Sequence, residues 1–191
     1  MRDTARAVLE FLDGLGIEYR KAEHPPAFTM ADCVAVDRQL GALTVKNIFL
    51  TTKNRKHCFL CICRPDARFH TADISKQVGA SRLSFAPEAM LFQCLRCHGG
   101  SASPLGLVFP EARDVALIVD SALREVPTLA FHPCDNTQTV AMPAADFFDK
   151  FLTAVGTEVV DVVFNEEWGM GNGEWRLKSF GFLDCYNGVV G

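Results

Sequence analysis

An uninterrupted apolar run at residues 115–119 constrains the fold of this chain more than any other feature. Such a run is typical of a strand buried on both faces, because a half-exposed strand alternates apolar and polar residues. Residues 45–52 and 57–64 indicate two further strands, joined by a short basic turn in a hairpin-like pair. Since hairpin-like pairs do not suit a doubly wound parallel sheet, the interleaved helices and strands predict an α+β fold built on a mixed sheet.

Apolar residues at helical spacing and short strand-like runs account for most of the remaining chain. Helices are expected at residues 4–15, 29–40, 73–78, 87–94 and 144–155, and strands at 17–22, 82–85, 128–131, 139–142 and 158–164. Thr29, with Asp32 three residues later, predicts a capping box at the start of the second helix. Pro87 suits the first turn of the fourth helix, because its missing N–H has no partner there in any case.

The 191 residues suffice for one domain with its own hydrophobic core, which we expect to span residues 1–164. From Asn165 onward the composition changes, with three glycines and both tryptophans within residues 165–175. Residues 165–191 are therefore expected to form a C-terminal appendage that packs on the domain or on a partner.

Charge and hydropathy narrow the classes of partner. The formal net charge is −4, so a nucleic acid would have to be met by a local patch rather than by a global basic field. Residues 53–57 offer such a patch, although a solvated turn between two strands explains them equally well. No apolar run is long enough to cross a membrane, and the N-terminus begins an amphipathic pattern rather than a signal peptide. We therefore expect a cytoplasmic protein without a membrane partner.

The chain has eight cysteines, which we expect to be reduced thiols that pack as small hydrophobes. Residues 94–98 fit the spacing for covalent haem attachment, but that chemistry needs an export route that the sequence does not indicate. Cys58-x-x-Cys61 with Cys94-x-x-Cys97 resembles a zinc ribbon in outline. The first pair lies in a predicted strand, where residues three apart point to opposite faces. We accordingly expect no bound metal.

Three unusual segments are the candidates for chemistry. They are the lysine–asparagine pair Lys46–Asn47 inside an apolar strand, a glycine-rich loop at residues 99–107, and His132–Pro133 followed by Asn136–Thr137. Each segment also has a purely structural interpretation. The lysine could lie on an edge strand and face water, and the other two segments could be ordinary turns. The chain has no Gly-x-Ser-x-Gly elbow and no His-Glu-x-x-His motif, and no Lys-Ser/Thr pair makes the loop a P-loop. Together the segments favour a site that orients a labile ester and stabilises its oxyanion.

Taken in order, these segments resemble the YbaK-type aminoacyl-tRNA editing domains, which are related to the editing insertion of bacterial prolyl-tRNA synthetase. Lys46–Asn47 on a strand, the Gly100-x-x-x-Pro104 loop, and His132–Pro133 with Asn136–Thr137 carry the resemblance. Residues 24–29 and 105–107 are closer to the branch of free-standing alanyl-tRNA(Pro) deacylases, the ProX or PrdX proteins. The likeness covers roughly residues 3–164, so the C-terminal appendage lies outside it.

The resemblance implies a mixed sheet curled toward a barrel and flanked by helices. It also implies an aminoacyl-tRNA hydrolase without a cofactor, which removes alanine from mischarged proline tRNA. Lys46 would hold the terminal adenosine, and the Gly100 loop would bind the scissile carbonyl, with the 2′-hydroxyl of the terminal ribose assisting the attacking water. Further substrate-binding residues would be Asn47, Ser101, Ala102, Ser103, Pro104, Asn136 and Thr137. Met30, Phe49 and His132 would border a pocket that excludes proline by size.

Two alternatives to this activity remain. The same chemistry could act on another mischarged tRNA, such as cysteinyl-tRNA(Pro), since pocket volume is not readable from the sequence. A module that binds tRNA or a synthetase without catalysis is the second alternative. The expected partners are the acceptor end of the tRNA and, as a further candidate, prolyl-tRNA synthetase.

Overall fold

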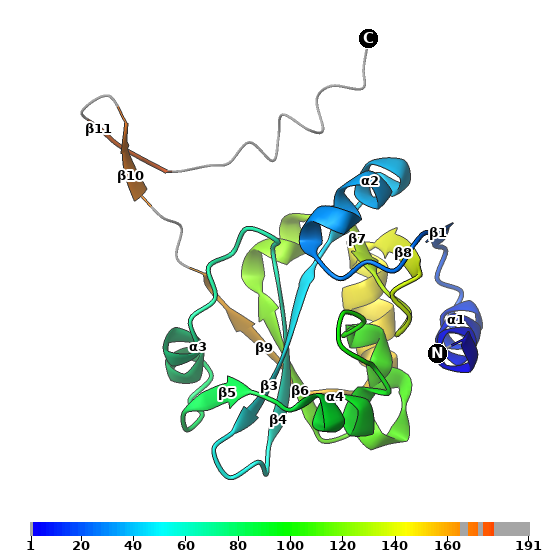
Figure 1. Ribbon diagram of the computed structural model, residues 1–191, viewed down its shortest axis with the longest axis horizontal. Coiled ribbons are helices and arrows are strands. Elements are labelled where there is room, and N and C mark those ends of the chain that lie inside the picture. The colour runs from blue at the N-terminus through cyan, green and yellow to red at the C-terminus, as the bar shows by residue number, and fades with distance from the viewer. Residues whose placement is uncertain (1, 165–167, 172–173, 178–191) are drawn as a thin grey trace.

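The computed structural model describes residues 2–164, 168–171 and 174–177. Its helices are α1 (Arg2–Gly14), α2 (Met30–Leu40), α3 (Thr71–Gln77), α4 (Glu88–Leu95) and α5 (Leu152–Val155), with a π-helical segment at Asp146–Phe151 leading into α5. Short 3₁₀ segments lie at Pro104–Val108, Pro110–Ala112 and Ser121–Glu125. The strands form two mixed sheets and a separate two-stranded pair (Figure 1).

The first sheet has the order β1-β8-β7-β2, and the second has the order β5-β3-β4-β6-β9. The first comprises β1 (Arg20–Glu23), β8 (Gln138–Pro143), β7 (Thr128–Phe131) and β2 (Leu43–Thr44). The second comprises β5 (Leu83–Phe85), β3 (Lys46–Thr52), β4 (Cys58–Cys63), β6 (Val115–Asp120) and β9 (Val159–Val162). Both sheets contain parallel and antiparallel pairs, which confirms the predicted α+β fold with mixed sheets.

The two sheets are joined where β2 runs on into β3. β2 pairs with β7 in the first sheet, and β3 pairs with β4 and β5 in the second, so one extended stretch of chain serves both. The described strands form two open sheets rather than one closed ring. The expected curl toward a barrel is therefore incomplete, because the chain changes sheet at Val45 instead of continuing one ladder.

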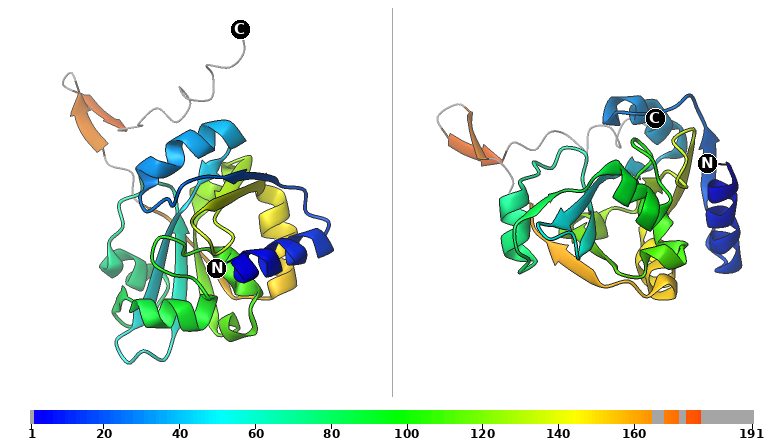
Figure 2. Two further views of the ribbon diagram at one scale, coloured as in Figure 1. Left: turned by 45° about the vertical axis from the view of Figure 1, so that its right-hand side comes forward. Right: turned by 60° about the horizontal axis from the view of Figure 1, so that its bottom comes forward.

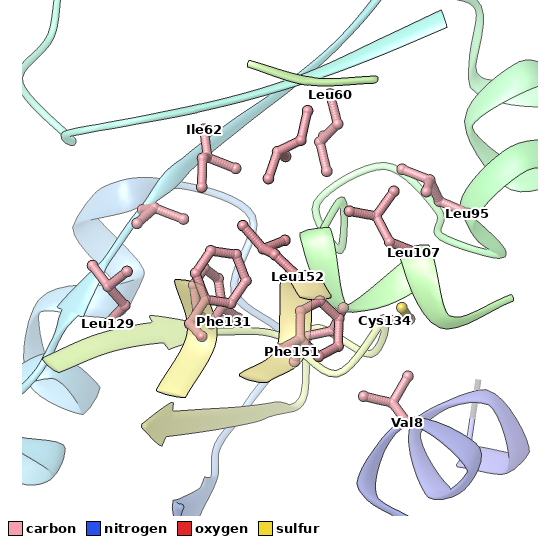
Figure 3. Close-up of a cluster of buried hydrophobic side chains, with 14 of the residues drawn as sticks. Val8, Leu60, Ile62, Leu95, Leu107, Leu129, Phe131, Cys134, Phe151 and Leu152 are labelled. Carbon is pink, nitrogen blue, oxygen red and sulfur yellow. The ribbon is translucent and has the colours of Figure 1, made fainter. Parts of the chain in front are cut away.

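The main hydrophobic core lies between the two sheets (Figure 3). Leu60 and Ile62 enter it from the second sheet and Leu129 and Phe131 from the first, and further apolar side chains come from α1, α4 and the 146–155 helix. The rings of Phe131 and Phe147 are 4.6 Å apart, and both side chains are fully buried. Each buried ring of this size contributes about 1.5–3 kcal/mol to the free energy of unfolding.

Two smaller clusters cover the outer faces of the sheets. Ile118 packs with Ile74 of α3 behind the second sheet, and Ala130 packs with Val36 of α2 behind the first. In β6, Leu117 and Val119 face the main core while Ile118 faces the α3 side. The expectation that residues 115–119 form a strand buried on both faces is thus confirmed.

The predicted helix boundaries hold where a local signal marks them. Thr29 caps α2, and its capping box with Asp32 is present. Pro87 is the N-cap residue of α4, one position before the helix begins. The helix expected at 144–155 is present and begins at Ala144, but its residues 146–151 are π-helical, and the rings of Phe147 and Phe151 stack there 5.6 Å apart. α1 lies alongside it, with Phe11 6.1 Å from Phe151 (Figure 2).

The expected appendage is described only at β10 (Trp168–Gly171) and β11 (Glu174–Leu177), which pair in antiparallel fashion. Residues 165–167, 172–173 and 178–191 of that predicted segment, and with them Cys185, lie outside the described residues. Among the described helices, none combines the length and apolar character that a membrane crossing requires.

The seven described cysteines are free thiols. Cys58 and Cys61 lie on β4, as predicted, and strand geometry turns them to opposite faces. Within residues 2–164 and the two strands beyond them, no three His, Cys, Asp or Glu side chains gather as a metal site would require. A hydrogen bond between the Cys61 and Cys63 thiols, together with burial, raises the pKa of Cys61, as expected for thiols that serve as packing.

Candidate active site

The glycine-rich loop is rigidly built around Gly100. Gly100 has φ +81°, in a turn closed by the Ser101 N–H donating to the His98 carbonyl at 2.9 Å. A Cβ at this position would come within 3.0 Å of the Phe28 ring and 3.5 Å of the Ala27 carbonyl oxygen. Only glycine combines this backbone angle with so close an approach. The loop backbone is therefore pressed against residues 27–28, far away in the sequence.

Two buried serines hold the loop in shape. The Ser101 hydroxyl bonds both the N–H and the carbonyl of His98 at 3.0 Å, and the Ser103 hydroxyl accepts from the Leu105 N–H at 3.1 Å. Ala102 between them is partly exposed, and Pro104 is buried at the start of the 3₁₀ segment. The hydroxyls of Ser101 and Ser103 thus bond within the loop and fix its shape.

The loop at residues 132–137 also contacts Ala27, which the Gly100 turn approaches. The Asn136 side-chain N–H donates to the Ala27 carbonyl at 3.2 Å, and the Asn136 carbonyl accepts from the Ala27 N–H at 3.0 Å. The Asp135 carboxylate accepts from the N–H and the hydroxyl of Thr137, at 3.0 and 2.7 Å. Residues 24–28, Gly100 and the 132–137 loop therefore form one cluster, and the sequence analysis did not assign Ala27 or Phe28 to it.

His132 is the polar centre of this cluster. Its Nδ1 lies 2.8 Å from the Gln138 carbonyl and 3.2 Å from the Thr139 hydroxyl, whose oxygen is also 2.8 Å from Nε2 of His24. Because a carbonyl can only accept, Nδ1 of His132 carries the hydrogen, and Nε2 is the ring atom that can accept. Burial lowers the pKa of His132, so its ring is neutral at pH 7.

His24 is the partner that the sequence analysis did not include among the site residues. Its Nδ1 lies 2.8 Å from the Pro25 carbonyl, so the Thr139 hydroxyl donates to its Nε2. The two imidazole rings are 5.7 Å apart. The contact between His24 and Thr139 spans 115 residues, so no local pattern in the sequence indicates it.

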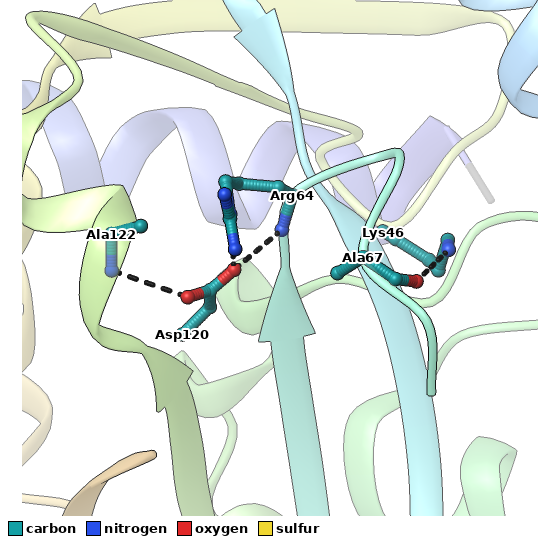
Figure 4. A network of polar contacts seen from close by, with 5 residues as sticks. All are labelled: Lys46, Arg64, Ala67, Asp120 and Ala122. Atoms are coloured by element: carbon teal, nitrogen blue, oxygen red, sulfur yellow. Dashed lines mark hydrogen bonds and ion pairs between the residues drawn. The ribbon is translucent and has the colours of Figure 1, made fainter. Parts of the chain in front are cut away.

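Lys46 and Asn47 lie on opposite faces of β3. The Lys46 Nζ donates to the Ala67 carbonyl at 2.8 Å (Figure 4). Asn47 shares its face with Phe49, which is buried in the main core. The Asn47 amide donates to the Val45 carbonyl at 3.1 Å, while in the described part of the chain its buried Oδ1 accepts no hydrogen bond. Such a buried acceptor calls for a donor from water or from a ligand.

Strand register relates Lys46 to His132. β2 and β7 run parallel and pair at Thr44 and Ala130. Lys46 and His132 each follow two residues later, so both lie just past the same end of this pair. Met30, the remaining residue of the expected pocket, is the first residue of α2 and is partly exposed. The register thus places Lys46 and His132 at the same end of the β2–β7 pair, and the Gly100 turn lies against Asn136 of the His132 loop.

Comparison with known proteins agrees with this geometry. Residues 24–150 match the family model of the aminoacyl-tRNA editing domain. A relative named prolyl-tRNA editing protein ProX, from Acetoanaerobium sticklandii, is 32% identical over 155 residues, covering 81% of this chain and 93% of its own. A mouse protein named prolyl-tRNA synthetase associated domain-containing protein 1 is 33% identical over 165 residues, covering 84% and 96%.

The fold has solved counterparts as well. The structure of a candidate trans-editing enzyme for prolyl tRNA synthetase superposes with a TM-score of 0.64 at 17% identity, covering 85% of this chain and 98% of the other. The family model spans the glycine loop, the lysine strand and the histidine loop together. On these grounds the chain belongs to the family of aminoacyl-tRNA editing domains.

Proposed function

We propose that this protein is a trans-editing deacylase that hydrolyses alanine from mischarged proline tRNA. The editing-domain family and the names of its relatives support a deacylase that edits aminoacylated proline tRNA. The observation that carries the proposal is the Gly100 turn, whose positive-φ backbone is held by Ser101 and pressed against Ala27. A rigid backbone of this kind can offer N–H groups to a developing oxyanion without reorganising during the reaction.

The loop already binds an anionic oxygen in this structure. The Gly99 N–H donates to the Glu88 carboxylate at 2.9 Å, at the start of the same turn. The Gly99 and Ser101 N–H groups thus already have acceptors, and other N–H groups of this loop would serve the carbonyl oxygen of an ester, which becomes negative as water attacks. In the proposed reaction the 2′-hydroxyl of the terminal ribose assists that water, so no strong protein base is needed.

Lys46 would supply the positive charge of the proposed site. Its ammonium group, anchored on Ala67, would contact an oxygen of the terminal adenosine and hold the ester against the loop. Met30, Phe49 and His132 would border the amino-acid pocket, with Asn47, Asn136 and Thr137 as further substrate contacts. A pocket of fixed size admits alanine more readily than the larger proline ring.

Binding would be confined to the acceptor end of the tRNA. With a formal net charge of −4, the chain lacks the global positive field that long nucleic-acid contacts need. We therefore propose a cytoplasmic enzyme that engages the single-stranded 3′ end, with prolyl-tRNA synthetase as a candidate partner.

The test is deacylation of one tRNA carrying different amino acids. Alanyl-, cysteinyl- and prolyl-tRNA(Pro) are incubated with the wild type, with Lys46→Ala and with Lys150→Ala, a control lysine paired with Asp146 on the far helix. We expect the wild type and Lys150→Ala to release alanine and spare proline, and Lys46→Ala to retain only a small residual rate. Preferential release of cysteine would reassign the substrate, and binding of tRNA without release of any amino acid would refute the enzyme.

A further inference from the structure

Asp120 is a buried carboxylate that the proposed reaction does not use. It ends β6, and its side chain is 1% exposed. Its oxygens accept from Nε of Arg64 at 2.8 Å, from the Arg64 backbone N–H at 3.2 Å and from the Ala122 N–H at 3.2 Å (Figure 4). Burying a charge is costly, and such a pair is weak evidence of a gain in stability. The position of Asp120 indicates instead that it fixes a neighbouring segment of the chain.

The carboxylate fixes the segment that leaves β4. Arg64 directly follows that strand, and its carbonyl accepts from the Ala67 N–H at 3.1 Å, which closes a tight turn. The carbonyl at the end of this turn, on Ala67, accepts from Lys46 Nζ at 2.8 Å. Asp120, the Arg64–Ala67 turn and Lys46 therefore form one continuous chain of hydrogen bonds.

Strand register keeps this chain short. Lys46 pairs with Cys63, the residue before Arg64, and β4 pairs with β6 in parallel, so the three strand ends lie side by side. Asp120 and Lys46 also act on the same neighbour, the Cys61 thiol. The Cys63 hydrogen bond and burial raise the pKa of Cys61, and the Asp120 charge raises it further, whereas the Lys46 charge lowers it. Both charges thus lie near the outer face of the second sheet.

We infer that Asp120 is a positioning residue for Lys46, acting through Arg64 and the turn that presents the Ala67 carbonyl. The inference rests on the proposed function, in which Lys46 holds the adenosine end of the ester. With the carboxylate gone, the ion pair between Arg64 and Asp120 is lost, the bonds from Asp120 no longer tie the turn to β6, and the lysine ammonium loses a fixed acceptor. A displacement of about 1 Å at a positioning group can cost about a hundredfold in rate.

The direct test observes the lysine itself. In NMR spectra of protein with ¹⁵N-labelled lysine, the Nζ protons of a hydrogen-bonded ammonium group give a signal. The signal of Lys46 is assigned by its loss in Lys46→Arg. We expect this signal in the wild type and its loss through faster exchange in Asp120→Asn. The matched control is Asp161→Asn on the neighbouring strand β9. It breaks an exposed ion pair with Arg124 and should leave the Lys46 signal unchanged. A Lys46 signal unchanged in Asp120→Asn would overturn the inference.

A double-mutant cycle gives the kinetic test. Asp120→Asn should lower kcat/KM for alanyl-tRNA(Pro) about ten- to a hundredfold in the wild-type background, yet have little further effect on the residual rate of Lys46→Ala. An equal loss in both backgrounds would show a merely structural role and refute the inference. If Asp120→Asn does not fold, Arg64→Lys takes its place, because it keeps the charge and changes only the donor geometry.

Amino-acid release tests the proposed function, and the Lys46 signal tests the positioning role of Asp120. If the wild type releases no amino acid while the Lys46 signal responds to Asp120→Asn as expected, the proposed function fails and the positioning contact stands. If the wild type is active and the signal does not respond, the positioning inference alone fails.

Discussion

Replacing Gly100 with alanine separates the cost of a strained backbone from the loss of a substrate contact. Gly100 has φ +81°, where an L-residue is disfavoured by about 1–2 kcal/mol. The new Cβ would also lie 3.0 Å from the Phe28 ring, but Phe28 is 70% exposed and can turn away. We therefore expect Gly100→Ala to lose about 1–2 kcal/mol of unfolding free energy, which lowers the melting midpoint by about 2–8 °C for a chain of this size.

The effect on deacylation should be far larger than this loss implies. To relieve the strain, the turn relaxes toward negative φ, which reorients the peptide groups around residue 100. Losing one aligned oxyanion donor costs about 10²–10³ in rate. We expect a decrease of this size in kcat for alanyl-tRNA(Pro), measured under single-turnover conditions at a temperature where the variant is fully folded.

Gly79 provides the matched control. It has φ +64°, and a Cβ there would meet nothing within 4 Å. Gly79→Ala should therefore lose about the same 1–2 kcal/mol in urea unfolding and keep full activity. If Gly100→Ala is as destabilised as Gly79→Ala and hydrolyses alanyl-tRNA(Pro) within threefold of the wild-type rate, the loop backbone is not the clamp for the ester.

Three further outcomes follow from the site. Lys46→Ala should lose about 10²–10³ in kcat/KM but only about 1 kcal/mol of stability, the value of one hydrogen bond to Ala67, as measured by deacylation and urea unfolding; a collapse of the fold would contradict this. Burial lowers the pKa of His132 in the folded protein. Below about pH 6.5 this imidazole is therefore protonated in the unfolded chain while it is still neutral in the folded one. Stability should thus fall as the pH drops from about 6.5 and level off below the folded pKa, and His132→Gln should lack that part of the fall. Prolonged treatment with a chelator should change neither the melting midpoint nor the rate, and a stoichiometric metal in the untreated protein would refute the assignment of the cysteines to packing.

Local patterns in the sequence predicted much of the fold. The apolar run in β6 indicated burial on both faces, and Thr29 with Asp32 indicated the start of α2, because each signal lies within a few neighbouring residues. The 3₁₀ segments escaped prediction, since so short a helix has no room for a repeating apolar pattern. The change of sheet at Val45 is set by pairing with β7, which no local pattern reports.

For the candidate site, too, local patterns predicted some residues but not the contacts between distant segments. The sequence supplied Lys46, Gly100 and His132 as separate motifs. Their surroundings depend on long-range contacts: Ala67 anchors Lys46 across 21 residues, and Thr139, which contacts His132, bonds His24 across 115. Such partners are fixed by how the sheets pack, so the supporting contacts became visible only in the folded chain.

The central claim is tested most directly by the ratio of two rates on a single tRNA. Proline tRNA is charged in separate reactions with alanine and with proline, and the deacylation of each is followed in single turnovers with the wild-type protein. The account predicts hydrolysis of the alanyl ester about 10- to 200-fold faster than that of the prolyl ester, the range over which the size of an apolar group discriminates. Equal rates for the two esters, or no hydrolysis of the alanyl ester at micromolar enzyme, would contradict it.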